Sequence, residues 1–153
     1  MSHDFEPGLS STGGRRLRIA QVAPPLERVP PSAYGGTERI VHELTTELVR
    51  RGHEVTVFAS ADSIVPCRLV ATVETPLRPA GIEDDSGPAF ERTLEIVLGH
   101  AAEFDVIHSH LEQFSMDLVR RACTQAVSER EDLDWKSKLV PHPATEQQHR
   151  RTR

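Results

Sequence analysis

Two consecutive glycines stand directly before a long amphipathic segment, in the stretch AYGGTER that contains Gly35, Gly36 and Thr37. Glycine lets a backbone approach an anion closely, and the free amides at the start of a following helix can point toward that anion. Each charge-assisted amide bond would contribute about 1.5 to 3 kcal/mol. The stretch could therefore bind a phosphate group. The alternative is a tight turn that needs a positive φ, and the stretch alone favours neither.

A second group of polar residues follows the predicted strand DVIHSH, which contains His108 and His110. Residues two apart share one face of a strand, so the two imidazoles could meet. A catalytic zinc needs a further protein ligand, and the chain has no HExxH or CxxC motif, so we predict no metal site. Two interpretations remain: a structural histidine bonded to loop backbone, or a polar group in a ligand cleft. His110 is the better cleft candidate, and Glu112 and Ser115 follow it and could contact hydroxyls of a sugar or other polar acceptor.

Several catalytic motifs are absent from the sequence. The chain has no GxGxxG or GK[ST] loop after its first strand and no GxSxG elbow, which disfavours dinucleotide, P-loop and serine hydrolase chemistry. Cys67 and Cys123 lack metal-site spacing and are interpreted as ordinary reduced thiols. The net charge of −5 argues against a nucleic-acid-binding face. Because no signal peptide or apolar run of about 20 residues occurs, we expect a cytoplasmic protein without a transmembrane segment.

The apolar pattern predicts strands and helices in alternation. The first helix is predicted to start with Thr37 as its N-cap, to bury Ile40 with its other apolar residues, and to end at Gly52. Strands are predicted at 17–23, 53–59, 68–73 and 104–110, and two later helices at about 90–103 and 115–126. This order predicts an α/β fold, a Rossmann-like doubly wound and mostly parallel sheet with helices on both faces.

The two ends of the chain lack this pattern. Residues 1–15 are rich in serine and glycine and are expected to form a flexible leader. Residues 128–153 have mixed charge and no consistent period, so we expect a disordered tail, or weak docking through Trp135 and Leu139. The predicted domain is therefore 16–127.

Two segments, RIAQVAPPLERVPPSAYGGTERIVHELTTELVRRGHEVTVFASADS and FDVIHSHLEQFS, together resemble the N-terminal domain of family 4 glycosyltransferases with the GT-B fold. The resemblance covers about residues 16–126. It implies two facing Rossmann-like domains, with the nucleotide-sugar donor held mainly by the second and acceptor contacts mainly by the first. It also implies retaining transfer without a bound metal or other cofactor. By position, Gly35, Gly36 and Thr37 match the loop that approaches the donor diphosphate, and His110 matches a histidine near the acceptor side.

The sequence departs from the family pattern after the third predicted helix. Relatives continue into a strand that ends in His-Gly, whereas here His142 stands between two prolines. The donor domain's pair of glutamates eight positions apart also lacks its context, because Glu83/Glu91 spans a Gly-Pro turn and Glu95/Glu103 lacks the surrounding pattern. We therefore predict an incomplete N-terminal GT-B domain: the acceptor-side half of a retaining glycosyltransferase, inactive alone. The alternative is a non-catalytic interaction module that pairs with a separately encoded donor-binding domain.

Overall fold

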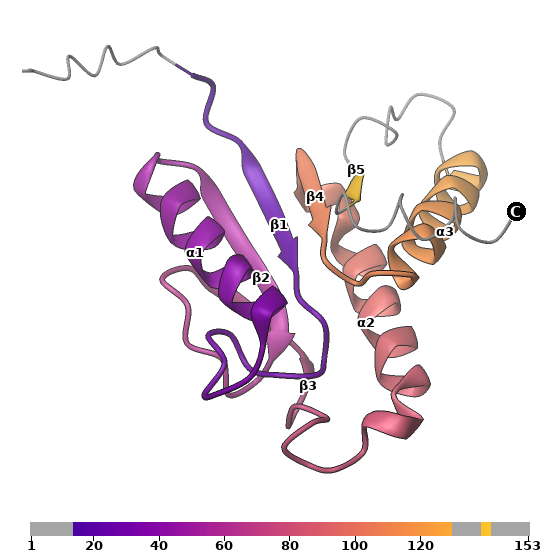
Figure 1. Cartoon of the computed structure of the whole chain (residues 1–153). Coiled ribbons are helices and arrows are strands. Elements are labelled where there is room, and N and C mark those ends of the chain that lie inside the picture. The colour runs from indigo at the N-terminus through magenta and orange to yellow at the C-terminus, as the bar shows by residue number, and fades with distance from the viewer. Residues whose placement is uncertain (1–13, 130–138, 142–153) are drawn as a thin grey trace, which may run out of the picture.

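The computed structural model describes residues 14–129 and 139–141 of the 153-residue chain. Its five strands form one sheet in the order β3-β2-β1-β4-β5, and every neighbouring pair is parallel (Figure 1). The strands are β1 (Arg18–Val22), β2 (Glu54–Ser60), β3 (Arg68–Val73), β4 (Val106–Ser109) and β5 (Leu139–Pro141). The helices are α1 (Gly36–Arg50), α2 (Gly87–His100) and α3 (Phe114–Glu129), with single 3₁₀ turns η1 (Glu83–Asp85) and η2 (Ala101–Glu103).

Strand β2 lies inside the sheet and is buried from its second residue to its last. Such a continuous run is typical of a parallel strand covered on both faces. Its side chains alternate between two cores: Val57 and Ala59 join a cluster with Val41 of α1, whereas Phe58 joins the larger cluster formed with α2 and α3. Helices therefore cover both faces, which confirms the predicted Rossmann-like, doubly wound α/β fold.

Helix α1 is amphipathic, with Val41 and Thr45 fully buried. The prediction that Ile40 belongs to the buried stripe is wrong, because its side chain is 50% exposed at the edge of that face. At the other end of the helix, Glu47 pairs with Arg50 and Arg51, each at 2.7 Å. Gly52 follows with φ +87° and ends the helix, as its position predicted.

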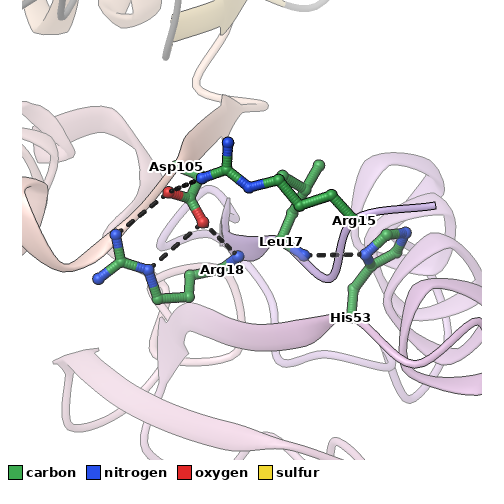
Figure 2. Close-up of polar contacts among 5 residues, drawn as sticks. All are labelled: Arg15, Leu17, Arg18, His53 and Asp105. Carbon is green, nitrogen blue, oxygen red and sulfur yellow. Dashed lines mark hydrogen bonds and ion pairs between the residues drawn. The ribbon is translucent and has the colours of Figure 1, made fainter. Parts of the chain in front are cut away.

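Arg18 and Asp105 connect the amino ends of the neighbouring strands β1 and β4 (Figure 2). The Arg18 guanidinium donates to both carboxylate oxygens of Asp105, and the Arg18 backbone N–H donates to Oδ2 at 2.9 Å. Nearby, the Leu17 backbone N–H donates to Nδ1 of His53 at 3.3 Å. These contacts lie at the amino ends of the strands, opposite to their carboxyl ends.

The C-terminal part of the described chain differs from the sequence prediction in two places. Helix α3 continues to Glu129, three residues beyond the end predicted at Ala126. Within the range expected to be a tail, Leu139–Pro141 forms β5, and Leu139 lies beside Ile107 of β4. Only two apolar residues precede Pro141, which is too short a run to be recognised without its partner strand. Residues 1–13 of the predicted leader at 1–15, Trp135 and His142 lie outside the described residues.

Candidate functional site

The sheet has a topological switch point between β1 and β4. From β1 the chain continues to β2 and β3 on one side, and it then returns to β4 and β5 on the other side (Figure 1). In open parallel sheets, ligands bind outside the carboxyl ends of the strands at this point. The loops that follow β1 and β4 both carry residues that the sequence singled out, so these loops define the candidate site.

The loop between β1 and α1 is anchored to the segment after β2. The Val29 N–H donates to Ser63 Oγ at 2.9 Å, and the Ile64 N–H donates to the Val29 carbonyl at 2.7 Å. Both Val29 and Ser63 are buried. This side of the loop is therefore fixed by paired backbone groups that are shielded from water.

The same loop is also anchored to the segment between β3 and α2. The Leu77 N–H donates to the Pro25 carbonyl, and the Arg78 N–H donates to the Leu26 carbonyl, each at 3.0 Å. The Arg78 side chain adds an ion pair with Glu27 at 3.3 Å. Anchors on both sides hold the path of the chain into α1.

The two glycines at the start of α1 have different structural needs. Gly35 has φ +149°, and a Cβ added there would lie 2.7 Å from Cβ of Pro31, so the turn requires glycine. Gly36 is exposed, and a Cβ added there would meet nothing within 4 Å. The prediction of Thr37 as N-cap is wrong, because the permissive Gly35 takes that position and the helix begins at Gly36. Thr37 lies half-buried in the first turn.

A charged cluster that sequence reasoning missed lies beside this helix start. Glu38 is 3% exposed, and burial raises the pKa of its carboxyl. Hydrogen bonding to its own backbone amide and the positive charge of Arg78 lower that pKa, whereas the carboxylates of Glu27 and Glu112 raise it further. The guanidinium of Arg78 also lies over the ring of Tyr34, 5.1 Å from its centroid. These residues come from three separate loops and the first turn of α1, and no local spacing predicted that they meet.

The histidine pair lies at the end of β4, as expected, with ring centroids 4.2 Å apart. His110 is 2% exposed, and its Nε2 lies 3.0 Å from Oε1 of Gln21 in β1. Its backbone N–H donates to the Val22 carbonyl at 3.0 Å. His110 therefore connects the end of β4 to β1 from within the protein, with the side chain of Gln21 as one of its partners.

The other two residues expected in an acceptor cleft lie in different environments. Ser115 is buried, and its Oγ lies 2.9 Å from that of Ser109 in β4. Glu112 is exposed and has φ +50°, and it is the one non-glycine residue with positive φ in the part of the chain that the structure describes. A left-handed conformation is uncommon for glutamate and recurs at functional sites. Of the three, Glu112 reaches the surface.

A hollow of about 220 Å³ opens beside Glu112, outside the switch point. Its walls come from the loop after β1, the start of α2 and the connection from β4 to α3. The lining residues are Leu26, Ser86, Phe90, Leu111, Glu112, Gln113 and Phe114. Among residues 14–129 and 139–141, no group of three or more metal-ligating side chains comes together. In the same described part, no helix has the length and apolar character needed to cross a bilayer.

The sequence model of Glycosyltransferase Family 4 matches residues 34–127, which include the start of α1, Glu112 and nearly all of α3. No curated protein sequence matches the chain. The matched range covers more than half of the chain and contains residues from both loops of the candidate site.

Proposed function

Because the chain belongs to glycosyltransferase family 4, we propose that it forms the acceptor-side domain of a retaining glycosyltransferase that uses a nucleotide-sugar donor. In such a transfer, the bond between the sugar's anomeric carbon and the donor diphosphate breaks. A new bond forms between that carbon and an acceptor hydroxyl oxygen, whose proton passes to the departing diphosphate or to water. The nucleoside diphosphate is the leaving group.

The observation that carries this proposal is the placement of Gly36 at the start of α1 and of Glu112 in the loop after β4, because the segments after β1 and β4 meet outside the switch point. Gly36 presents backbone without a side chain at the start of a 15-residue helix, and the fold itself does not require glycine there. A diphosphate oxygen could therefore approach the amides of the first turn, which favour negative charge. Glu112 lies at the hollow on the other loop, where an acceptor would enter.

The charged cluster limits how tightly this domain can hold a diphosphate by itself. Glu38 and Glu27 are carboxylates near the helix start, and Arg78 is already paired with Glu27. Two or three amide contacts to a diphosphate, opposed by the negative charges of Glu27 and Glu38, give weak binding. We therefore assign most of the donor contacts to a second domain that faces the carboxyl ends of the strands. This second domain would come from another segment or from a separate chain.

Nucleoside diphosphate binding to the full chain tests the glycine loop. Titration with UDP and with GDP, followed by NMR, should shift the backbone amides of Gly36 and Thr37. Gly36→Val should weaken the binding about tenfold or more, the equivalent of losing one charge-assisted bond. Gly99→Val is the matched control, because Gly99 is also exposed in a helix and its added Cβ meets nothing within 4 Å. Equal binding by the two variants would mean that the open backbone at Gly36 does not contact the diphosphate.

Turnover distinguishes an incomplete enzyme from a binding module. Transfer from a nucleotide sugar should require a donor-binding domain in addition to this chain. Transfer by the purified chain alone would contradict the assignment of donor contacts to a second domain. If the chain binds the nucleotide and the donor domain but transfer never appears, the function is that of a non-catalytic interaction module.

A further inference from the structure

Resting on the acceptor role proposed above, we infer that the hollow beside Glu112 is a subsite for one neutral, polyhydroxylated six-membered ring of the acceptor, a monosaccharide or a cyclitol. Its volume of about 220 Å³ is below the range of about 300–1,000 Å³ typical of pockets for drug-sized ligands. The hollow therefore has room for one ring, and the rest of a longer acceptor would lie outside it.

The lining of the hollow combines apolar and polar groups. Phe90 and Phe114 stack with their centroids 4.3 Å apart and their planes 17° from parallel, which gives the hollow a rigid aromatic wall. Ser86, Glu112 and Gln113 supply hydroxyl, carboxylate and amide groups. A sugar or cyclitol ring has the matching character, because its C–H faces are apolar and its edge carries hydroxyls that donate and accept hydrogen bonds.

The charge of the lining selects against anionic rings. Glu112 is the only ionisable side chain among the residues that line the hollow. A sugar phosphate or a uronic acid would bring a second negative charge beside that carboxylate, whereas a neutral hydroxyl could donate a hydrogen bond to it.

The position of Glu112 is fixed by the turn that begins α3. The Phe114 N–H donates to the Leu111 carbonyl at 3.0 Å, and the Ser115 N–H donates to the Glu112 carbonyl at 3.1 Å. These bonds hold the left-handed backbone of Glu112 at the wall of the hollow. We assign Glu112 the role of a binding residue that orients an acceptor hydroxyl.

Binding to the full chain tests the subsite without any need for transfer. Glucose and myo-inositol are titrated by NMR, with a hexose phosphate as the anionic counterpart. The neutral rings should shift the amides of Gln113 and Phe114 at millimolar concentration, because one ring makes few contacts. The hexose phosphate should bind several times more weakly at these residues, and Glu112→Gln should abolish that difference. Glu95→Gln, an exposed position on α2, is the matched control.

Two variants test the wall of the hollow. Phe114→Leu and Gln113→Ala should each weaken binding of the neutral rings about tenfold at most, with thermal unfolding recorded to confirm that both variants fold. If Phe114→Leu does not fold, Gln113→Ala alone decides. The inference is overturned if neutral rings fail to shift these amides, if the variants bind them unchanged, or if the hexose phosphate binds more tightly. The nucleotide-binding result at Gly36 would stand in each case, so the failure of this subsite is distinguishable from failure of the transferase proposal.

Discussion

Asp105, which directly precedes β4, is hydrogen-bonded to Arg18, the first residue of β1, through both the side chain and the backbone of Asp105. The carboxylate accepts from the Arg18 guanidinium and from the Arg18 N–H, while the Asp105 N–H donates to the Arg18 carbonyl at 2.8 Å. The two residues are 87 positions apart in the chain. Because β1 and β4 flank the switch point, this pairing joins, at their amino ends, the two strands whose carboxyl ends lead into the candidate site.

The Arg18 pairing predicts a specific pH dependence of stability. Hydrogen bonds from the Arg18 side chain and then its backbone lower the pKa of Asp105 to about 2, below the ordinary value of about 3.9. A depressed pKa means that the stabilisation is present above about pH 4 and is lost as the pH falls toward 2. Asp105→Asn should therefore lower the melting temperature at pH 7, and the difference from wild type should vanish near pH 2.

Thermal unfolding between pH 2 and pH 7 measures this effect. Glu47→Gln is the control, because the pKa of Glu47 is also lowered to about 2 but its partners lie within the same helix end. Glu47→Gln should lower the melting temperature less than Asp105→Asn does, since ion pairs three or four residues apart on a helix contribute little to stability. A deficit of Asp105→Asn that is the same at pH 2 and pH 7 would contradict the electrostatic explanation.

The two glycines before α1 should respond differently to alanine. Gly35→Ala places a Cβ against Pro31 at a positive φ and should cost about 1 to 3 kcal/mol of unfolding free energy. Gly36→Ala has open space and should stay within about 0.5 kcal/mol of wild type. Urea denaturation measures both. Equal losses would mean that Gly36 is also a structural glycine, which would remove the reason to assign its open backbone to a ligand.

The contact between His110 and Gln21 should contribute to stability more than to ligand binding. Gln21→Leu removes the partner of His110 Nε2 inside the protein and should cost about 1 to 3 kcal/mol. The double variant with His110→Leu should lose less than the sum of the single losses, because the two groups form one interaction. Urea denaturation of all four chains gives the coupling. If His110→Leu leaves stability unchanged but weakens sugar binding, the histidine belongs to the cleft.

Cys67 should react slowly with alkylating reagents. Burial raises the pKa of its thiol to about 11, and the backbone of Val57 offsets this only in part. At pH 8 about a thousandth of the thiol would be ionised, and the thiolate is the reactive form. Iodoacetamide labelling of the peptide containing Cys67, followed by mass spectrometry, should be slow in the folded chain and fast in urea. Equal rates would show that the thiol is not protected by the fold.

Local patterns were sufficient to predict most of the fold. Strand β3 was predicted at 68–73 and forms over those residues, because alternation and flanking turn residues define a strand without its neighbours. Gly52 ends α1 for a similarly local reason. The strand at Leu139–Pro141 is three residues long and pairs with β4, so its short sequence carried no comparable signal.

The candidate site was less predictable because it depends on tertiary packing. Sequence position correctly brought His108 and His110 together, but it could not show that His110 would be buried against β1. The Arg78 and Glu27 pair joins loops 51 residues apart, and neither residue stands in a motif. The exposed Glu112 was singled out from the sequence, whereas its left-handed backbone became visible only in the structure.

Glu38 should destabilise the domain at neutral pH. Its carboxyl is 3% exposed, and burial raises its pKa more than the attraction of Arg78 lowers it. An acid whose folded pKa is raised costs stability once the pH exceeds its ordinary value of about 4.3, and the full cost is reached above its folded pKa. Glu38→Gln should therefore raise the melting temperature at pH 7 to 8 and leave it unchanged below about pH 4. The control is Glu43→Gln, on the exposed face of the same helix, which should leave the melting temperature unchanged at both pH values.

A lower melting temperature of Glu38→Gln at pH 7 would show that the attraction of Arg78 outweighs the effect of burial on the Glu38 carboxylate. A rise would show that the domain keeps a charged, destabilising carboxylate beside the open backbone of Gly36, as expected where a site is arranged for ligand binding rather than for stability.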